Sequence, residues 1–143
     1  MEQLQFLRLD RARFDALCGL HRAYKEAIGE DAPTQADLDR LLGAMEREKI
    51  LFYGCVDEGG QLVGCCSVSP TFSTYTYATA GVFEDFYILP AFRHRGIARR
   101  LVSFAVEDSG VSSLIVGCAN CDAEMYKALG FTVPLGNLLA FEL

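Results

Sequence analysis

The segment Phe83–Leu101, with the sequence FEDFYILPAFRHRGIARRL, constrains the fold more than any other part of the chain. Its first seven residues form a hydrophobic run that predicts a strand, and Pro90 ends that strand because proline cannot donate to the hydrogen-bond ladder of a sheet. From Gly96 the apolar residues recur at helical spacing, which predicts an amphipathic helix. Five basic side chains lie around this glycine within eight residues, although the chain has a formal net charge of -6: Arg93, His94, Arg95, Arg99 and Arg100.

The composition favours one compact domain and opposes binding to extended anionic surfaces. A chain of 143 residues with 51% hydrophobic residues can bury a core, so we expect residues 1–143 to form a single domain. The negative net charge argues against nucleic acid or an anionic membrane as a partner, because both require positive charge over a wide face. The start MEQLQFLRLD lacks the pattern of a signal peptide and no run of about 18 apolar residues occurs, so we expect no membrane segment and a cytoplasmic protein. The basic cluster is then expected to bind a small anionic group.

The six cysteines predict neither a metal site nor disulfides. Most lie within apolar segments, which is typical of reduced, buried cysteine. Cys118 and Cys121 form the one CxxC pair, but a zinc site needs a second pair of ligands at suitable spacing. Neither the adjacent cysteines in QLVGCCSVSP nor the two histidines, His21 and His94, provide one. We therefore expect no metal and no redox role.

Hydrophobic periodicity predicts the remaining helices and strands. Asp10 is expected to cap a helix over residues 11–28, and Thr34 or Asp37 to start a second helix that ends near Lys49. Two strands, ILFYGCVD and QLVGCCSVSP, form an antiparallel hairpin joined by EGG, because glycine tolerates the positive φ of tight turns. The segment TFSTYTYATAG is either a continuation of the second strand or a surface loop. The other predicted elements are a first strand LQFLRL, a strand SLIVGC, a short helix DAEMYKALG ended by Gly130, and final strands FTVP and NLLAFEL, which gives the order βααβββαβαββ.

The basic turn before the predicted helix suits a phosphate group. A helix N-terminus offers unpaired N–H groups and about half a positive charge, and guanidinium groups add charge-assisted hydrogen bonds. Gly96 has no Cβ to obstruct a phosphate, and Ala98 keeps the next flank small. A P-loop would require GxxxxGK[ST] and a dinucleotide site GxGxxG, and neither pattern occurs. The alternative is that the arginines form only a solvated helix start.

The sequence YILPAFRHRGIARRL resembles the acetyl-CoA-binding motif of the GNAT superfamily of N-acetyltransferases, which is hydrophobic-x-Pro-x-x-Arg-x-x-Gly-x-Gly/Ala. Arg93, Gly96 and Ala98 occupy its defining positions, and further along MYKALGF matches the Tyr-x-x-x-Gly-Phe of that superfamily. The resemblance covers the order of elements over nearly the whole chain and is strongest to spermidine/spermine and aminoglycoside-type acetyltransferases. It implies an α/β fold with a mixed, largely antiparallel sheet flanked by helices, in which two central parallel strands, FEDFYIL and SLIVGC, splay apart.

The resemblance also implies that acetyl-CoA is the cofactor and that its pantetheine arm lies between the splayed strands. The pyrophosphate would rest on backbone N–H groups from His94 to Arg99. Asn120 lies six residues before Tyr126, one fewer than the family spacing, and Ala119 takes the nominal place. Arg95 and Arg100 either stay solvated or meet the adenosine 3′-phosphate. The full set of implied cofactor-binding residues is Phe86, Tyr87, Ile88, Arg93, His94, Arg95, Gly96, Ile97, Ala98, Arg99, Asn120 and Tyr126.

Acetyl transfer to an amine requires a neutral amine, a polarised carbonyl and a proton for the leaving thiolate. The resemblance places Tyr126 at the general-acid position, where a phenol with an ordinary pKa of about 10 stays protonated at neutral pH. It makes Glu84 the base, acting through water, and the N–H near Ile88 the oxyanion donor. Asp85 is expected either to bind a cationic substrate or, like Glu84, to close a salt bridge. Strand alternation predicts one face with Glu84, Phe86 and Ile88 and the other with Phe83, Asp85 and Tyr87.

The acceptor amine is expected to lie between residues 22–34 and residues 72–80, which form the substrate walls in similar proteins. Acidic residues in the first wall favour a small cationic amine such as a polyamine or an aminoglycoside. Two other interpretations stay open: a CoA-binding module or sensor without transfer activity, and a transferase for another acyl group. The apolar end NLLAFEL is either an internal strand or a homodimer contact. The expected substrate-binding residues are Tyr24, Phe72, Tyr75, Tyr77, Glu84 and Asp85.

Overall fold

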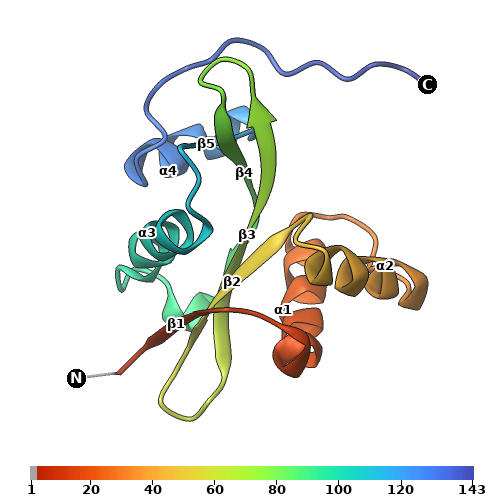
Figure 1. Cartoon of the computed structure of the whole chain (residues 1–143). Coiled ribbons are helices and arrows are strands. Elements are labelled where there is room, and N and C mark those ends of the chain that lie inside the picture. Colours follow the sequence, from red (N-terminus) through yellow and green to blue (C-terminus); the bar gives the residue numbers. More distant parts are fainter. Residues whose placement is uncertain (1–2) are drawn as a thin grey trace.

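The structure is a computed structural model that describes residues 3–143. Five strands form one sheet in the order β1-β2-β3-β4-β5, in which only β4 and β5 run parallel (Figure 1). The predicted mixed, largely antiparallel sheet flanked by helices is therefore confirmed. The elements are β1 (Gln5–Arg8), α1 (Phe14–Ala27), α2 (Gln35–Glu46), β2 (Leu51–Val56), β3 (Leu62–Ser73), β4 (Ala78–Ile88), α3 (Ile97–Ser109), β5 (Ser113–Val116) and α4 (Ala123–Ala128), with single 3-10 turns at Arg11–Arg13, Pro90–Phe92 and Asn120–Asp122.

Side chains at the predicted positions start the first two helices. The Asp10 carboxylate accepts a hydrogen bond from the N–H of Ala12 at 3.0 Å, which fixes the turn that leads into α1. Thr34, rather than Asp37, is the cap of α2. The two residues form a reciprocal capping box, because the Thr34 hydroxyl accepts from the Asp37 N–H and the Asp37 carboxylate accepts from the Thr34 N–H.

The helices cover both faces of the sheet. Figure 1 shows α1 and α2 on one side of the strands and α3 and α4 on the other. On the first side, Leu17 of α1 and Leu38 of α2 pack with Phe52 of the sheet in a buried cluster. On the second side, Leu101 of α3 packs against the fully buried Phe83. The sheet therefore separates two apolar cores, and β4 contributes side chains to both.

The segment over residues 71–81, which the sequence left between strand and loop, is mostly strand. β3 continues to Ser73 and β4 begins at Ala78, so the two strands form a long hairpin whose turn spans residues 74–77. This turn projects away from the core, with Tyr75 94% exposed. The hairpin of β2 and β3 also forms as predicted, and its turn has a positive φ of 85° at Gly60.

β4 contains a bulge that breaks the expected alternation. Ser67 of β3 pairs with Glu84, whereas Cys65 pairs with Tyr87, so two steps along β3 match three along β4. The additional residue is Asp85, whose φ of 53° lies in the left-handed region. The predicted faces are therefore wrong for Phe83 and Glu84, which precede the bulge, whereas Phe86 and Ile88 share a face as predicted. Phe83 and Phe86 lie on the same face, that of α3, with ring centroids 5.7 Å apart, while Glu84, Asp85 and Tyr87 turn toward α1.

The two predicted final strands are wrong. Within residues 3–143 no strand follows β5, and the chain after α4 runs along the outside of the molecule (Figure 1). Leu138, Leu139 and Phe141 are each at least 87% exposed. A continuous apolar run is typical of a strand that is covered on both faces, and no layer among the described residues covers residues 137–143. The observed order is therefore βααβββαβα.

Candidate active site

The two parallel strands separate as the sequence predicted. β4 and β5 pair from Ala80 and Ser113 to Phe83 and Val116, where β5 ends. β4 continues for five more residues, and in residues 3–143 no strand pairs with this stretch, residues 84–88, on the β5 side. Backbone amides along an open strand edge bind an extended ligand in the way that another strand would. We call this stretch the open edge.

The first turn of α3 leaves its N–H groups available to a ligand. Gly96 caps α3 with a φ of 77° and no side chain caps the helix, so its first-turn amides have no partner within the helix. Arg100 is the first residue of this helix whose N–H bonds back, to the carbonyl oxygen of Gly96 at 3.4 Å. A Cβ at Gly96 would meet no protein atom within 4 Å, so open space lies above this turn. The helix start thus fits a diphosphate.

The arginine side chains around this turn are partly engaged by the protein itself. Arg93 donates from Nε to the carbonyl oxygen of Ile88 at 2.8 Å, and its guanidinium lies 5.4 Å from the centroid of the Tyr87 ring. Arg99 donates to the carbonyl oxygen of Ala128, the last residue of α4, at 2.6 Å. The guanidinium groups of Arg95 and Arg100 lie over aromatic rings, 5.1 Å from that of Phe92 and 4.6 Å from that of Phe6. These arginines therefore hold the turn against β4, α4 and β1, and they also provide positive charge around it.

Tyr126 of α4 lies beside the open edge. Its ring centroid is 6.3 Å from that of Phe86 and 6.4 Å from that of Phe83, so the phenol is packed against the α3 face of β4. Burial raises the pKa of Tyr126, and the nearby Asp122 and Cys118 add to the rise. The phenol is therefore protonated at neutral pH. Asn120 begins the short turn before α4 and is exposed, with Ala119 as the residue that precedes the turn.

Acidic side chains gather on the opposite face of the bulge. Asp85 accepts a hydrogen bond from the Ser67 hydroxyl at 2.7 Å, and Glu84 is exposed. Tyr24 of α1 lies next to this face, with its ring 6.3 Å from that of Tyr87. Burial raises the pKa of Tyr24 to about 12, and the negative charge of Asp85 makes the second largest contribution. The structure thus places Tyr24, Glu84 and Asp85 close enough together that both carboxylates influence the phenol.

The sequence analysis missed His21 as a residue of this site. His21 is 8% exposed and its Nδ1 has no hydrogen-bond partner, which costs about 1–3 kcal/mol for a buried polar atom. Its ring is held 6.0 Å from Tyr24 and 6.2 Å from Phe52. The signal in the sequence was the spacing, because His21 precedes Tyr24 by three residues and therefore shares its helix face.

Comparison with known proteins gives a family for this fold and this site. Residues 48–133 match the family model described as an acetyltransferase (GNAT) domain. The chain belongs to the GNAT acetyltransferase family. The matched residues include the open edge, the basic turn and Tyr126, and the cofactor of this acetyltransferase is acetyl-CoA.

Solved structures show the same fold at low sequence identity. An acetyltransferase from Trypanosoma brucei is 19% identical with a TM-score of 0.76, and the match covers 99% of this chain and 100% of the other. An aminoglycoside acetyltransferase from an uncultured soil metagenomic sample, in complex with sisomicin, is 13% identical with a TM-score of 0.82 and coverage of 98% and 95%. A protein from Clostridium acetobutylicum, described as a predicted acetyltransferase with acetyl-CoA, is 15% identical with a TM-score of 0.79 and coverage of 98% and 96%. No curated protein gave a match.

Three expected substrate residues of the acetyltransferase lie apart from this site. Phe72, Tyr75 and Tyr77 surround the tip of the β3–β4 hairpin, where the rings of Phe72 and Tyr77 pack 6.4 Å apart. Phe72 lies five positions along β3 from Ser67, the residue that contacts Asp85. At about 3.4 Å per residue this separation is roughly 17 Å. The structure therefore does not bring the hairpin tip together with Glu84 and Asp85.

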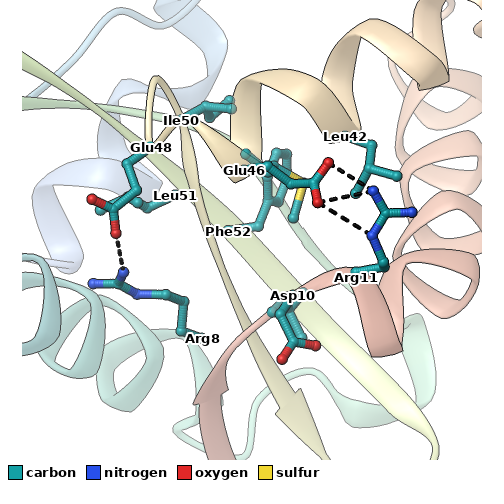
Figure 2. Close-up of a pocket in the computed structure, with 11 residues that line it drawn as sticks. Arg8, Asp10, Arg11, Leu42, Glu46, Glu48, Ile50, Leu51 and Phe52 are labelled. Carbon is teal, nitrogen blue, oxygen red and sulfur yellow. Dashed lines mark hydrogen bonds and ion pairs between the residues drawn. The ribbon is translucent and has the colours of Figure 1, made fainter.

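Two cavities of the acetyltransferase lie away from this site. One, of about 290 Å³, lies between the end of β1 and the end of α2, and Figure 2 shows that charged side chains line it. Four of these charges are already paired, because Arg11 contacts Glu46 at 2.8 Å and Arg8 contacts Glu48 at 3.0 Å. The other, of about 360 Å³, is an apolar groove between α1 and the β2–β3 hairpin. Among the described residues, no group of three or more metal-ligating side chains occurs, and no helix has the length and apolarity to cross a membrane.

Proposed function

We propose that this acetyltransferase transfers an acetyl group to a primary amine of a small cationic molecule by direct attack, without a covalent enzyme intermediate. The acidic face of the bulge is the observation that supports this acceptor class most strongly. Glu84 and Asp85 belong to the open edge, and the negative charge of Glu30, like theirs, raises the pKa of Tyr24. A cationic amine would be attracted to these carboxylates and enclosed by aromatic rings.

The proposed cofactor site consists of the open edge and the start of α3. The main chain of Phe86, Tyr87 and Ile88 would bind the pantetheine amides, and the N–H groups from His94 to Arg99 would bind the diphosphate. The uncapped first turn of α3 and the empty space above Gly96 support this assignment. Bound acetyl-CoA supplies a thioester carbonyl as the electrophile. Asn120 is exposed beside α4 and is proposed to bind the pantetheine arm.

The proposed chemistry assigns one role to each reacting group. Glu84 accepts a proton from the ammonium through water, since its exposed carboxylate reaches solvent. Tyr126 donates a proton to the thiolate, because its raised pKa keeps the phenol protonated. The N–H near Ile88 stabilises the negative charge that develops on the carbonyl oxygen. Glu84 and Tyr126 lie on opposite faces of β4, so the amine and the sulfur would meet at the open edge of this strand.

The experiment is a panel of amines with saturating acetyl-CoA, in which release of CoA thiol is measured. Polyamines and aminoglycosides form one arm, and neutral peptide N-termini form the other. We expect acetylation in the cationic arm. Turnover of the peptides alone would contradict the proposed acceptor class, and binding of acetyl-CoA without acetylation of any amine would instead support a sensor. Competing acyl-CoAs in the same assay would identify a preference for another acyl group.

The proposal also includes the assembly of the protein. We propose a single domain over residues 1–143 and a homodimer formed through residues 137–143, whose apolar side chains are exposed on the monomer. Patches of this kind are typical of protein interfaces. Sedimentation of the purified chain over a range of concentrations tests the dimer. The cytoplasmic location stays a prediction.

A further inference from the structure

Ser67 is a buried polar residue of β3 that the proposed function does not use. It carries the only hydroxyl group within residues 62–68, the stretch of the strand that is buried throughout. Its side chain is 0% exposed, as are those of Cys66 and Val68 beside it. A buried hydroxyl is almost always hydrogen-bonded, and this one donates to Oδ2 of Asp85 at 2.7 Å. The single hydroxyl of this stretch therefore contacts a carboxylate of the proposed amine site.

The contact between Ser67 and Asp85 lies on the α1 side of the sheet. Cys65 belongs to the core beneath α1, whereas Cys66 and Val68 belong to the core beneath α3. Because side chains alternate along a strand, Ser67 shares the face of Cys65. The hydroxyl thus holds the carboxylate on the face where we propose that the amine binds.

The bulge in β4 is what brings Asp85 to this face. In a regular ladder Asp85 would pair with Cys66, whose side chain lies in the core beside α3. Instead its φ of 53° is in the left-handed region, and the Cys65 thiol donates to its carbonyl oxygen, with 3.6 Å between sulfur and oxygen. A strained backbone that its surroundings hold in place is typical of functional sites. Two side chains of β3 therefore hold the backbone and the carboxylate of one bulge residue.

The Asp85 carboxylate keeps one oxygen available to a ligand. Ser67 contacts Oδ2, and within residues 3–143 no lysine or arginine forms an ion pair with Asp85 or Glu84. Asp85 is partly buried, and a carboxylate withdrawn from water is stabilised by a cation. Glu84 is exposed and has no such hydroxyl partner, so the two neighbouring carboxylates differ in mobility and in contact with water.

We propose that Ser67 is a positioning residue of the amine site, whose hydroxyl fixes the Asp85 carboxylate so that its free oxygen binds a second cationic group of the acceptor. This inference rests on the proposed function. The nitrogen that attacks the thioester must be neutral, so a group that stays bound to Asp85 as a cation is a different one. No bond forms or breaks at Ser67 or Asp85. The pair therefore sets the affinity for the acceptor and favours molecules with at least two positive charges.

The first test is a double-mutant cycle of Ser67→Ala and Asp85→Asn, with spermidine as the amine and saturating acetyl-CoA. Alanine removes only the hydroxyl, so the packing of the strand is kept. We expect the KM for spermidine to rise at least about fivefold in each single variant, by a larger factor than kcat falls. The double variant should resemble Asp85→Asn, because Ser67 acts only through this carboxylate. An unchanged KM in Ser67→Ala, or effects that multiply in the double variant, would overturn the inference.

Ser69→Ala is the matched control, because Ser69 lies two positions further along β3, on the same face, and pairs with Val82 instead of Glu84. It reports the effect of removing a hydroxyl from this strand without the contact to Asp85. Its KM for spermidine should stay within about twofold of the wild type. A rise as large as that in Ser67→Ala would show that the effect belongs to the strand, and would contradict a positioning role.

The second test needs no turnover. Calorimetry in the presence of CoA measures the binding of 1,4-diaminobutane and of butylamine, which has the same carbon chain and one ammonium group. We expect the diamine to bind the wild type at least about tenfold more tightly than the monoamine, and this ratio to fall at least about fivefold in Ser67→Ala. Absence of binding, equal affinities of the two amines, or the same ratio in both proteins would refute the inference. Failure of the proposed function is distinguishable, because it would appear as binding of the diamine without its acetylation.

Discussion

At the scale of single residues, the site depends on groups whose protonation is set by burial. Tyr126 and Tyr24 are both held as neutral phenols, one on each face of β4. The residue types of the candidate site, and most of the residues around them, were predictable from the sequence motifs and their spacing. The orientation of Asp85 was not, because strand alternation assumes that every residue is paired, and a bulge is a local departure that the periodicity of FEDFYIL does not reveal.

Replacement of Tyr126 by Phe tests the acid. The packing against Phe83 and Phe86 is kept, because only the hydroxyl is removed. We expect kcat to fall by about 10²-fold, with little change in the unfolding free energy or in the affinity for acetyl-CoA. Thiol-release kinetics and calorimetry measure the two quantities. An undiminished kcat would show that another group protonates the sulfur.

Tyr53 makes the stability of the protein sensitive to alkaline pH. Its side chain is fully buried, and burial, followed by the nearby Asp108, raises the pKa of its hydroxyl to about 12. Because the folded pKa exceeds the unfolded value of about 10, the stabilisation is present below pH 10 and is lost as pH rises toward 12. Urea unfolding should show that Tyr53→Phe loses roughly 1–2 kcal/mol less than the wild type between pH 9.5 and 11. Tyr75→Phe, at the exposed hairpin tip, should behave as the wild type does.

At the scale of elements, the helices and the hairpins followed from local chemistry. Caps at Asp10 and Thr34 and the glycine turns are short-range signals that need no knowledge of the rest of the chain. The predicted final strands failed because a strand requires a neighbouring edge and a covering layer, and neither is encoded in the segment itself. The sequence NLLAFEL has the apolarity of a strand but no partner within the monomer.

The capping box of α2 gives a stability prediction. Thr34→Ala removes the hydroxyl that accepts the Asp37 N–H, and we expect a loss of about 1 kcal/mol in the free energy of unfolding. Gln35→Ala, at the next and exposed position, should change it by less than about 0.5 kcal/mol. Urea denaturation of the three proteins gives the comparison. Equal losses in the two variants would contradict a specific role for the cap.

The start of α3 gives a binding prediction with a control at the other end of the same helix. Gly96 and Gly110 both have a positive φ, 77° and 68°, and a Cβ at either would meet no protein atom within 4 Å. Gly96→Ala and Gly110→Ala should therefore each cost about 1 kcal/mol of stability. Only Gly96→Ala should weaken CoA binding, by at least about tenfold in calorimetry, because its methyl group would occupy the space of the diphosphate. Equal affinities in both variants would rule out this turn as the diphosphate site.

At the scale of the whole molecule, one sheet separates the proposed amine side from the α3 side, on which Tyr126 lies. The fold class was predictable because the order of the predicted elements and the acetyl-CoA-binding motif both indicate the same fold. The exposed C-terminal segment is the part that the monomer leaves unexplained. Replacing Leu139 and Phe141 by Ser should leave the unfolding free energy of the monomer within about 0.5 kcal/mol, since both side chains are 87% exposed. Sedimentation should then show a smaller association constant than for the wild type. Equal association in both proteins would place the contact elsewhere.

The hydrogen bond from Arg99 to the carbonyl of Ala128 has a consequence for mutagenesis. A substitution at position 99 would remove a positive charge from the start of α3, where we propose that the diphosphate binds, and would also remove the contact that ties this helix to α4, which bears Tyr126. Its phenotype would combine weaker affinity with slower turnover, because one guanidinium group links the proposed phosphate site to the helix of the proposed acid.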